Sequence, residues 1–258
     1  MGSWITFNVP PIDRLRSSRV DVLRAFFEKG GAVIDSSPMY GYSEEVIGYC
    51  LERLENDDSL FSATKVWTPT AWLGRKQIRE SHELWGVDRF SLLQVHNLVD
   101  WESHLPTLQE MKSEGAIRYI GMTTSHGRRH RKLERLMREQ PAFDFVQLTY
   151  NVRDREAERR LLPLAADRGL GVLVNRPFRR GALIDELEPH PLPSWASAID
   201  CATWPQFLLK FIVSHPAVTC AIPATSRVDH MLENMEALRG RLPDPKMRRR
   251  MVQYVGSL

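Results

Sequence analysis

The sequence contains few cysteines, three in 258 residues, and they are far apart. Cys50, Cys201 and Cys220 show neither the paired spacing of a zinc site nor the even number expected of a disulfide framework. This scarcity is typical of a reducing compartment, so we expect a cytoplasmic protein. The amino terminus also lacks the basic segment and apolar core of a secretory signal.

Long apolar runs are absent as well. No stretch approaches the roughly 20 residues of a membrane-spanning helix, so we expect no membrane insertion. Charge of one sign is not in excess either, because 35 basic residues stand against 32 acidic ones and the net charge is +3. This balance argues against nucleic acid or an anionic membrane as the main partner. None of these features indicates an oligomeric state.

What the sequence does contain is a regular series of short apolar runs, most of them followed by a stretch with helical periodicity. The first seven runs start 26 to 29 residues apart, which suits one strand, one loop and one helix per unit. The eight runs start near Trp4, Val33, Ser62, Ser91, Tyr119, Phe145, Gly171 and Val218. With a hydrophobic content of 43%, the chain predicts an α/β fold, a single (β/α)8 TIM barrel domain over residues 1–258.

The last interval is longer than the others, since the seventh and eighth runs start 47 residues apart. The excess predicts a functional loop after the seventh strand. Arg179 and Arg180 lie in this loop. Barrels often bind phosphate there, so two interpretations of these residues stay open: they bind a phosphate group, or they are solvated surface charges.

Three of the predicted strands end in residues that can take part in chemistry. Asp35 ends the second strand, Lys65 the third and His96 the fourth, and Tyr40 follows in the loop after Asp35. In a barrel of this kind the active site lies at the C-terminal ends of the strands. Taken singly, Lys65 fits a surface amine and His96 a hydrogen-bonded core histidine. Together they predict a catalytic cluster.

The order and spacing of Asp35, Tyr40, Lys65 and His96 resemble the catalytic tetrad of the aldo-keto reductase superfamily, and the resemblance extends over residues 2–234. It implies NADPH-dependent reduction of a small aldehyde or ketone. Tyr40 would donate a proton to the carbonyl oxygen, and Lys65 would lower the pKa of that phenol. Asp35 would hold Lys65 in place, and His96 would orient the substrate. This chemistry requires no metal ion.

The resemblance also implies a nicotinamide site, with departures from the usual residues. Thr123-Thr124 stands where the family usually has a Ser-Asn pair that holds the nicotinamide amide. Asn175 replaces the usual stacking tyrosine, which leaves Arg176 or Phe178 to cover the ring. We therefore expect the nicotinamide to be held by a changed set of side chains.

At the other end of the coenzyme, segment 222–227 resembles the loop that holds the adenosine 2′-phosphate. Ala224 and His230 replace two basic residues common there, but Arg227 offers a charged fork at a helix N-terminus. We therefore predict NADPH, with NAD less expected. The cofactor-binding residues implied by the resemblance are Thr123, Thr124, Gln147, Asn175, Arg176, Pro177, Phe178, Ile222, Ala224, Thr225, Ser226, Arg227, Glu233 and Asn234.

Both ends of the predicted barrel depart from regularity. Gly2-Ser3-Trp4 resembles the end of the family's first strand, so we expect a shortened first strand, or a true start upstream that could include a targeting segment. Residues 243–255 carry Met247, Met251 and Val255 at four-residue steps. This spacing predicts an extra C-terminal helix outside the barrel.

Two alternatives stay open. One is a Schiff-base aldolase on the same barrel, in which Lys65 attacks a carbonyl carbon without consuming NADPH. The other is a barrel that binds the cofactor without turnover. The presence of Asp35 and Tyr40 argues against the aldolase, and the complete tetrad argues against the inactive barrel.

Overall fold

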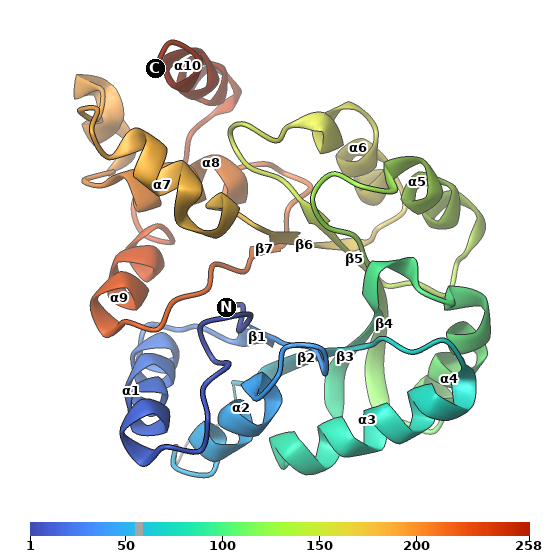
Figure 1. Ribbon diagram of the computed structural model, residues 1–258. Coiled ribbons are helices and arrows are strands. Elements are labelled where there is room, and N and C mark those ends of the chain that lie inside the picture. Colours follow the sequence, from blue (N-terminus) through green and yellow to red (C-terminus); the bar gives the residue numbers. More distant parts are fainter. Residues whose placement is uncertain (55–58) are drawn as a thin grey trace.

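The computed structural model describes residues 1–54 and 59–258, and within these ranges strands and helices alternate along the chain. Seven parallel strands lie side by side in chain order, and Figure 1 shows the sheet curling with helices around its outside. The strands are β1 Val33–Asp35, β2 Phe61–Val66, β3 Phe90–Val95, β4 Ile117–Thr123, β5 Phe145–Thr149, β6 Gly171–Asn175 and β7 Cys220–Ala221.

The helices follow the strands around the sheet. They are α1 Asp13–Glu28, α2 Ser43–Leu51, α3 Ala71–Trp85, α4 Trp101–Ser113, α5 His130–Glu139, α6 Leu161–Asp167, α7 Ala182–Leu187, α8 Trp204–Val213, α9 Val228–Glu236 and α10 Pro245–Gly256. Among the described helices, none is both long enough and apolar enough to cross a membrane.

The predicted first strand is reduced to a closing segment of two residues. Gly2 forms an isolated parallel bridge with Asp35, and the Asp35 N–H donates to the Met1 carbonyl at 2.8 Å. On the other side, the Gly2 N–H donates to the carbonyl of Pro223, just after β7, at 3.0 Å. Trp4 itself lies in a turn. The fold is therefore a (β/α)8 barrel with a shortened first strand, as predicted.

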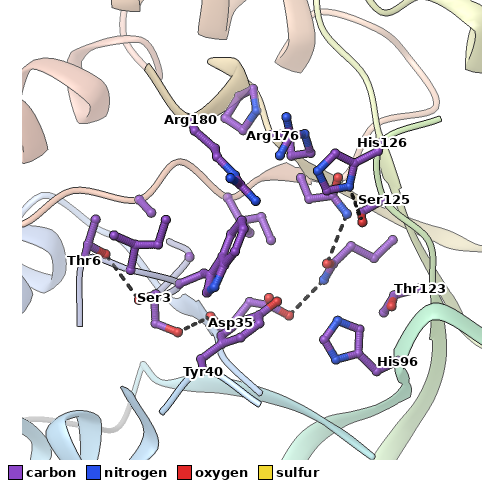
Figure 2. A pocket seen from close by; sticks show the side chains of 18 of the residues that line it. Ser3, Thr6, Asp35, Tyr40, His96, Thr123, Ser125, His126, Arg176 and Arg180 are labelled. Carbon is purple, nitrogen blue, oxygen red and sulfur yellow. Dashed lines mark hydrogen bonds between the residues drawn. The ribbon is translucent and has the colours of Figure 1, made fainter. Parts of the chain in front are cut away.

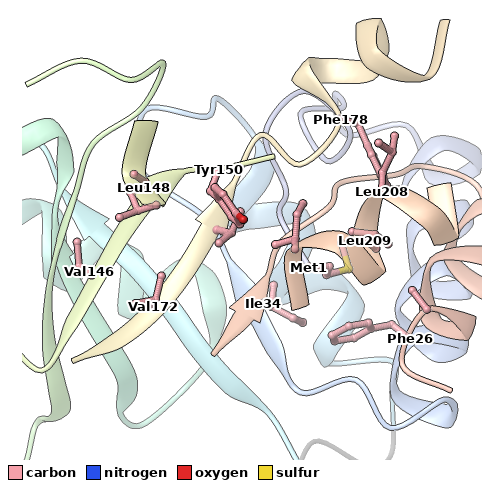
Figure 3. Packing of buried hydrophobic residues seen from close by; sticks show 14 of the residues in the cluster. Met1, Phe26, Ile34, Val146, Leu148, Tyr150, Val172, Phe178, Leu208 and Leu209 are labelled. Carbon is pink, nitrogen blue, oxygen red and sulfur yellow. The ribbon is translucent and has the colours of Figure 1, made fainter. Parts of the chain in front are cut away.

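Two apolar clusters lie on opposite faces of the sheet because successive residues of a strand point to opposite sides. Val146 and Leu148 of β5 belong to the large cluster between the sheet and the helices (Figure 3). Phe145 belongs to a small inner cluster around Ala63 and Leu92. The inner face thus carries apolar residues near the start of the strands, and polar ones follow toward their ends.

The long interval between β6 and β7 is mostly helical. After residues 176–178 it forms a 3-10 turn at Arg179–Gly181, helix α7, a second 3-10 helix at Ser194–Ile199, and α8. The interval that was predicted as a loop is therefore mostly helical. Residues 176–178 together with Arg180 and Gly181 reach the cavity at the strand ends.

The extra C-terminal helix is confirmed as α10. Met251 and Val255 are fully buried against the outer cluster. Arg248 of the same helix donates to Ser214 Oγ at 2.9 Å and pairs with Glu158 at 3.1 Å. Helix α10 therefore packs outside the barrel, and none of its residues lines the cavity.

Candidate active site

A cavity of about 400 Å³ opens at the C-terminal ends of the strands. Figure 2 shows Asp35, Tyr40 and His96 on one side of it, with Arg176 and Arg180 opposite. The predicted site residues that line it are Asp35, Tyr40, His96, Thr123, Thr124, Gln147, Asn175, Arg176, Pro177, Phe178, Ile222 and Ala224. Residues far apart in sequence are thus brought to a single site.

Lys65 does not line the cavity itself. Its side chain is only 1% exposed, so it is not a surface amine. Its Nζ is 2.6 Å from Asp35 Oδ2 and donates to the Ser36 carbonyl at 2.6 Å. The same atom is 5.2 Å from the centre of the Tyr40 ring. Burial acts to lower the pKa of Lys65, but the attraction of Asp35 and Tyr40 raises it overall. Lys65 is therefore a cation at neutral pH.

The second oxygen of Asp35 is held by two amides from the inner face. Gln94 Nε2 and Gln147 Nε2 each donate to Asp35 Oδ1 at 2.9 Å. Gly121 makes room for Gln94, because a Cβ at position 121 would lie 2.8 Å from Gln94 Cγ. The sequence analysis missed Gln94. The available signal was a polar residue in an apolar strand, two positions before His96 and therefore on the same face.

The Tyr40 phenol lies beside the His96 ring, with ring centres 5.8 Å apart at 86°. Burial raises the pKa of Tyr40, and the charge of Lys65 opposes this with a smaller effect. Lys65 lowers the pKa of Tyr40, as predicted, but the pKa of Tyr40 as a whole is raised, and in this respect the prediction is wrong. The reason is that the hydration free energy a phenolate would lose in this site is larger than the attraction that Lys65 provides. Tyr40 consequently keeps its proton at neutral pH.

His96 is neutral in this site. Burial lowers its pKa to about 3, and the nearby Lys65 charge acts in the same direction. Its Nδ1 is 3.0 Å from Ser37 Oγ, a contact between residues 59 positions apart. No sequence pattern singled out Ser37, because only the fold brings it to His96.

One wall of the cavity carries hydroxyl and amide groups. Thr123 Oγ1 accepts the Asn97 N–H at 2.9 Å. The Asn175 amide donates to the Thr124 carbonyl at 2.8 Å and accepts from Thr149 Oγ1 at 2.6 Å. Thr124 Oγ1, by contrast, is buried and has no partner in the described part of the chain. Since buried polar groups are normally paired, this hydroxyl fits the amide or carbonyl of a ligand.

The opposite wall carries two cations, Arg176 and Arg180. Within residues 1–54 and 59–258, the buried Nη1 of Arg176 has no partner, and the Arg180 guanidinium lies 4.0 Å over the Trp4 ring. Both have left-handed backbones, with φ of 53° and 65°, a strain common at functional sites. Arg179 instead donates to Asp154 at 2.8 Å and 2.5 Å. The cavity can therefore receive an anionic group beside Arg176 and Arg180, whereas Arg179 is already paired.

A second cavity of about 1030 Å³ adjoins the first at Phe178 and Ala224. Thr225, Glu233 and Asn234, which were also predicted to bind the cofactor, line this second cavity. Ser226 and Arg227 do not line it. Arg227 is exposed, and its Nε is 3.0 Å from Asp229 Oδ1. The predicted phosphate ligand is thus already paired with a carboxylate.

This parallel barrel holds a buried lysine–carboxylate pair at its strand ends and a half-buried phenol in the loop beside them. Comparison with known proteins shows to which family the arrangement belongs. The Aldo/keto reductase family matches residues 2–250, so this chain belongs to that family. It is 27% identical over 236 residues to the NADH-specific methylglyoxal reductase of Escherichia coli (strain K12), covering 77% of this chain and 68% of that protein. It is 28% identical over 249 residues to the L-galactose dehydrogenase of Arabidopsis thaliana, covering 85% and 77%.

A solved structure supports the fold. An aldo/keto reductase from Klebsiella pneumoniae, in complex with NADP and acetate, matches this structure with a TM-score of 0.84. The identity is 23%, and the match covers 99% of this chain and 90% of the other. At this identity the likeness establishes the barrel, whereas the chemistry depends on the residues of this chain.

Proposed function

We propose that this chain is an NADPH-dependent reductase that converts a small aldehyde or ketone into the alcohol. The observation that carries the proposal is the buried Lys65–Asp35 ion pair next to the protonated Tyr40 and the neutral His96. The nicotinamide coenzyme, when bound, supplies hydride to a carbonyl carbon. The protein must then give the carbonyl oxygen a proton.

Each residue has a distinct part in that proton transfer. Tyr40 donates its phenolic proton to the carbonyl oxygen, and Lys65 stabilises the phenolate that remains. Asp35 keeps Lys65 charged and oriented through one carboxylate oxygen. Asp35 is itself held in place because two amides donate to its other oxygen. His96, as a neutral ring, donates a hydrogen bond to the same carbonyl oxygen and stabilises the charge that develops there.

The residues present fit a dinucleotide coenzyme. The Thr124 hydroxyl, which has no partner among the described residues, suits the nicotinamide amide, and Arg176 and Arg180 suit the diphosphate. The second cavity would take the adenosine. For NADPH, the 2′-phosphate would bind Arg227 and the N-terminus of α9, in competition with Asp229.

The proposal is tested by Tyr40→Phe. We expect kcat for NADPH-dependent reduction to fall by at least ~10²-fold, the usual effect of losing a general acid, while the Kd for NADPH changes little. Tyr42→Phe is the matched control, since Tyr42 is an exposed phenol two residues away. If Tyr40→Phe kept turnover near that of the wild type, the assignment of Tyr40 as proton donor would be wrong.

Methylglyoxal and small aldoses are the first compounds to assay, given the names of the two relatives, followed by other aldehydes, ketones and quinones. The aldolase alternative needs an uncharged amine, and the raised pKa of Lys65 counts against it. Borohydride trapping of a substrate on Lys65 would support the aldolase. Tight NADPH binding with no turnover on any of these compounds would support the inactive barrel.

A further inference from the structure

Ser37 touches the site without belonging to the expected set of catalytic groups. It lies in the loop between Asp35 and Tyr40, and its side chain is fully buried. Its Oγ is 3.0 Å from Nδ1 of His96, whose own side chain is buried as well. The contact between Ser37 Oγ and His96 Nδ1 is therefore shielded from bulk water, and these two atoms have to satisfy their hydrogen bonds within the protein.

The direction of this hydrogen bond follows from the other contacts of the two groups. The Met39 N–H donates to Ser37 Oγ at 3.4 Å, so the hydroxyl already acts as an acceptor there. In the part of the chain that the structure describes, His96 Nδ1 is the one acceptor within reach of the Ser37 proton. The reverse arrangement, in which Nδ1–H donates, leaves the hydroxyl proton without a partner. The pairing therefore favours donation from Ser37 to Nδ1.

A neutral imidazole carries one proton, on either Nδ1 or Nε2. If Nδ1 accepts from Ser37, the proton of the ring is on Nε2. His96 lines the cavity, and Nε2 has no hydrogen-bond partner among the described residues. The edge-on packing of the Tyr40 ring against the imidazole restricts rotation of His96. Nε2–H is then available to a ligand beside the phenol.

We propose that Ser37 is a positioning residue that fixes His96 in the Nε2–H tautomer, so that the ring presents a donor to the carbonyl oxygen of the substrate. This inference rests on the proposed function. With Nε2–H in place, the oxygen receives hydrogen bonds from both Tyr40 and His96. In the other tautomer, the lone pair of Nε2 would face the oxygen and oppose binding. Burial keeps the ring neutral across physiological pH, which both tautomers require.

The first test reads the tautomer directly, without coenzyme or substrate. In ¹⁵N NMR spectra of ring-labelled protein at pH 7, we expect His96 to show a protonated Nε2 and an unprotonated, hydrogen-bonded Nδ1. Ser37→Ala should shift both resonances toward a mixture of tautomers. A protonated Nδ1 in the wild type, or an unchanged His96 signal in Ser37→Ala, would overturn the proposal. Because no turnover is needed, this result is independent of the proposed function.

The second test measures the consequence for catalysis. We expect Ser37→Ala to lower kcat/KM for carbonyl reduction about tenfold, with the Kd for NADPH unchanged, because one oriented donor is lost. Ser37→Thr keeps the hydroxyl and should recover most of the loss. Ser62→Ala is the control, since Ser62 is also buried but lies near the start of β2, at the end of the strand away from Lys65. A loss of activity in Ser37→Ala without a change of tautomer, or with no recovery in Ser37→Thr, would contradict the assignment.

Discussion

Asp229 is the residue at which we expect a single substitution to change coenzyme preference. It holds the Arg227 guanidinium through both carboxylate oxygens. The hydrogen bond from Arg227 is the largest cause that lowers the pKa of Asp229 to about 2, and a backbone N–H from His230 contributes as well. Asp229 therefore occupies the cation that a 2′-phosphate would use. An internal carboxylate and the ligand phosphate compete for the same groups.

We predict that Asp229→Asn tightens NADPH binding about fivefold and leaves the Kd for NADH unchanged, because only NADPH carries the competing anion. Fluorescence titration with both coenzymes measures this. Asp21→Asn removes a similar exposed aspartate from its pair with Arg24 on α1, and serves as the control. Equal gains for NADH and NADPH would show that Asp229 acts on the shared adenosine rather than on the phosphate.

Strands β3 and β4 set the position of the ion pair through their packing on the inner face. Gly121 of β4 leaves the space that the Gln94 side chain fills, and Gln94 in turn holds Asp35. A methyl group at position 121 would come within 2.8 Å of Gln94 and force it to move. The interior of the barrel thus links a glycine on one strand to a carboxylate on another.

Gly121→Ala should therefore lower kcat by displacing Gln94 from Asp35, and should destabilise the fold by about 1–3 kcal/mol through overpacking. Steady-state kinetics and urea denaturation measure the two effects. Gly256→Ala is the control, because no atom of the residues that the structure describes lies within 4 Å of a Cβ at that position. Unchanged kinetics in Gly121→Ala would mean that Gln94 is not needed to hold Asp35.

Sequence analysis predicted the elements and the ends of strands better than the contacts between them. Asp35, Lys65 and His96 could be placed because strand spacing and strand ends are local features. The contact between Gln94 and Asp35 could not, because it depends on the register of neighbouring strands, which aligns Asp35 with Ala63 and Lys65 with Gln94. The net pKa of Tyr40 likewise depends on burial, which exists only after the barrel has assembled.

At the scale of the whole molecule, the neutral His96 makes stability depend on pH. Its pKa is about 3 in the folded chain and about 6.5 when unfolded, so below pH 6.5 the unfolded state binds a proton that the folded state does not. The contribution of neutral His96 to the free energy of unfolding is fully present above about pH 6.5 and is lost as the pH falls toward about 3. Between pH 7 and pH 4 the loss amounts to about 3 kcal/mol at most.

His96→Asn removes this titration. We predict that the free energy of unfolding of His96→Asn falls less between pH 7 and pH 4 than that of the wild type, as measured by urea denaturation at each pH. His82→Asn is the control, since His82 lies on α3 and outside both cavities. Parallel losses in wild type and His96→Asn would show that another group dominates the acid instability.

Closure of the barrel by residues 1–2 has a consequence for how the molecule folds and opens. The N–H of Gly2 meets the carbonyl of Pro223, 221 positions later, whereas β1 to β6 each pair with the next strand along the chain. A contact between such distant positions gains little until the intervening units are in place, so we expect this seam to close late in folding. For the same reason we expect it to be among the first parts to open in the native state, so that its amide protons exchange sooner than those of β3 and β4. Because Gly2 also lines the cavity, we expect a bound ligand to slow that opening.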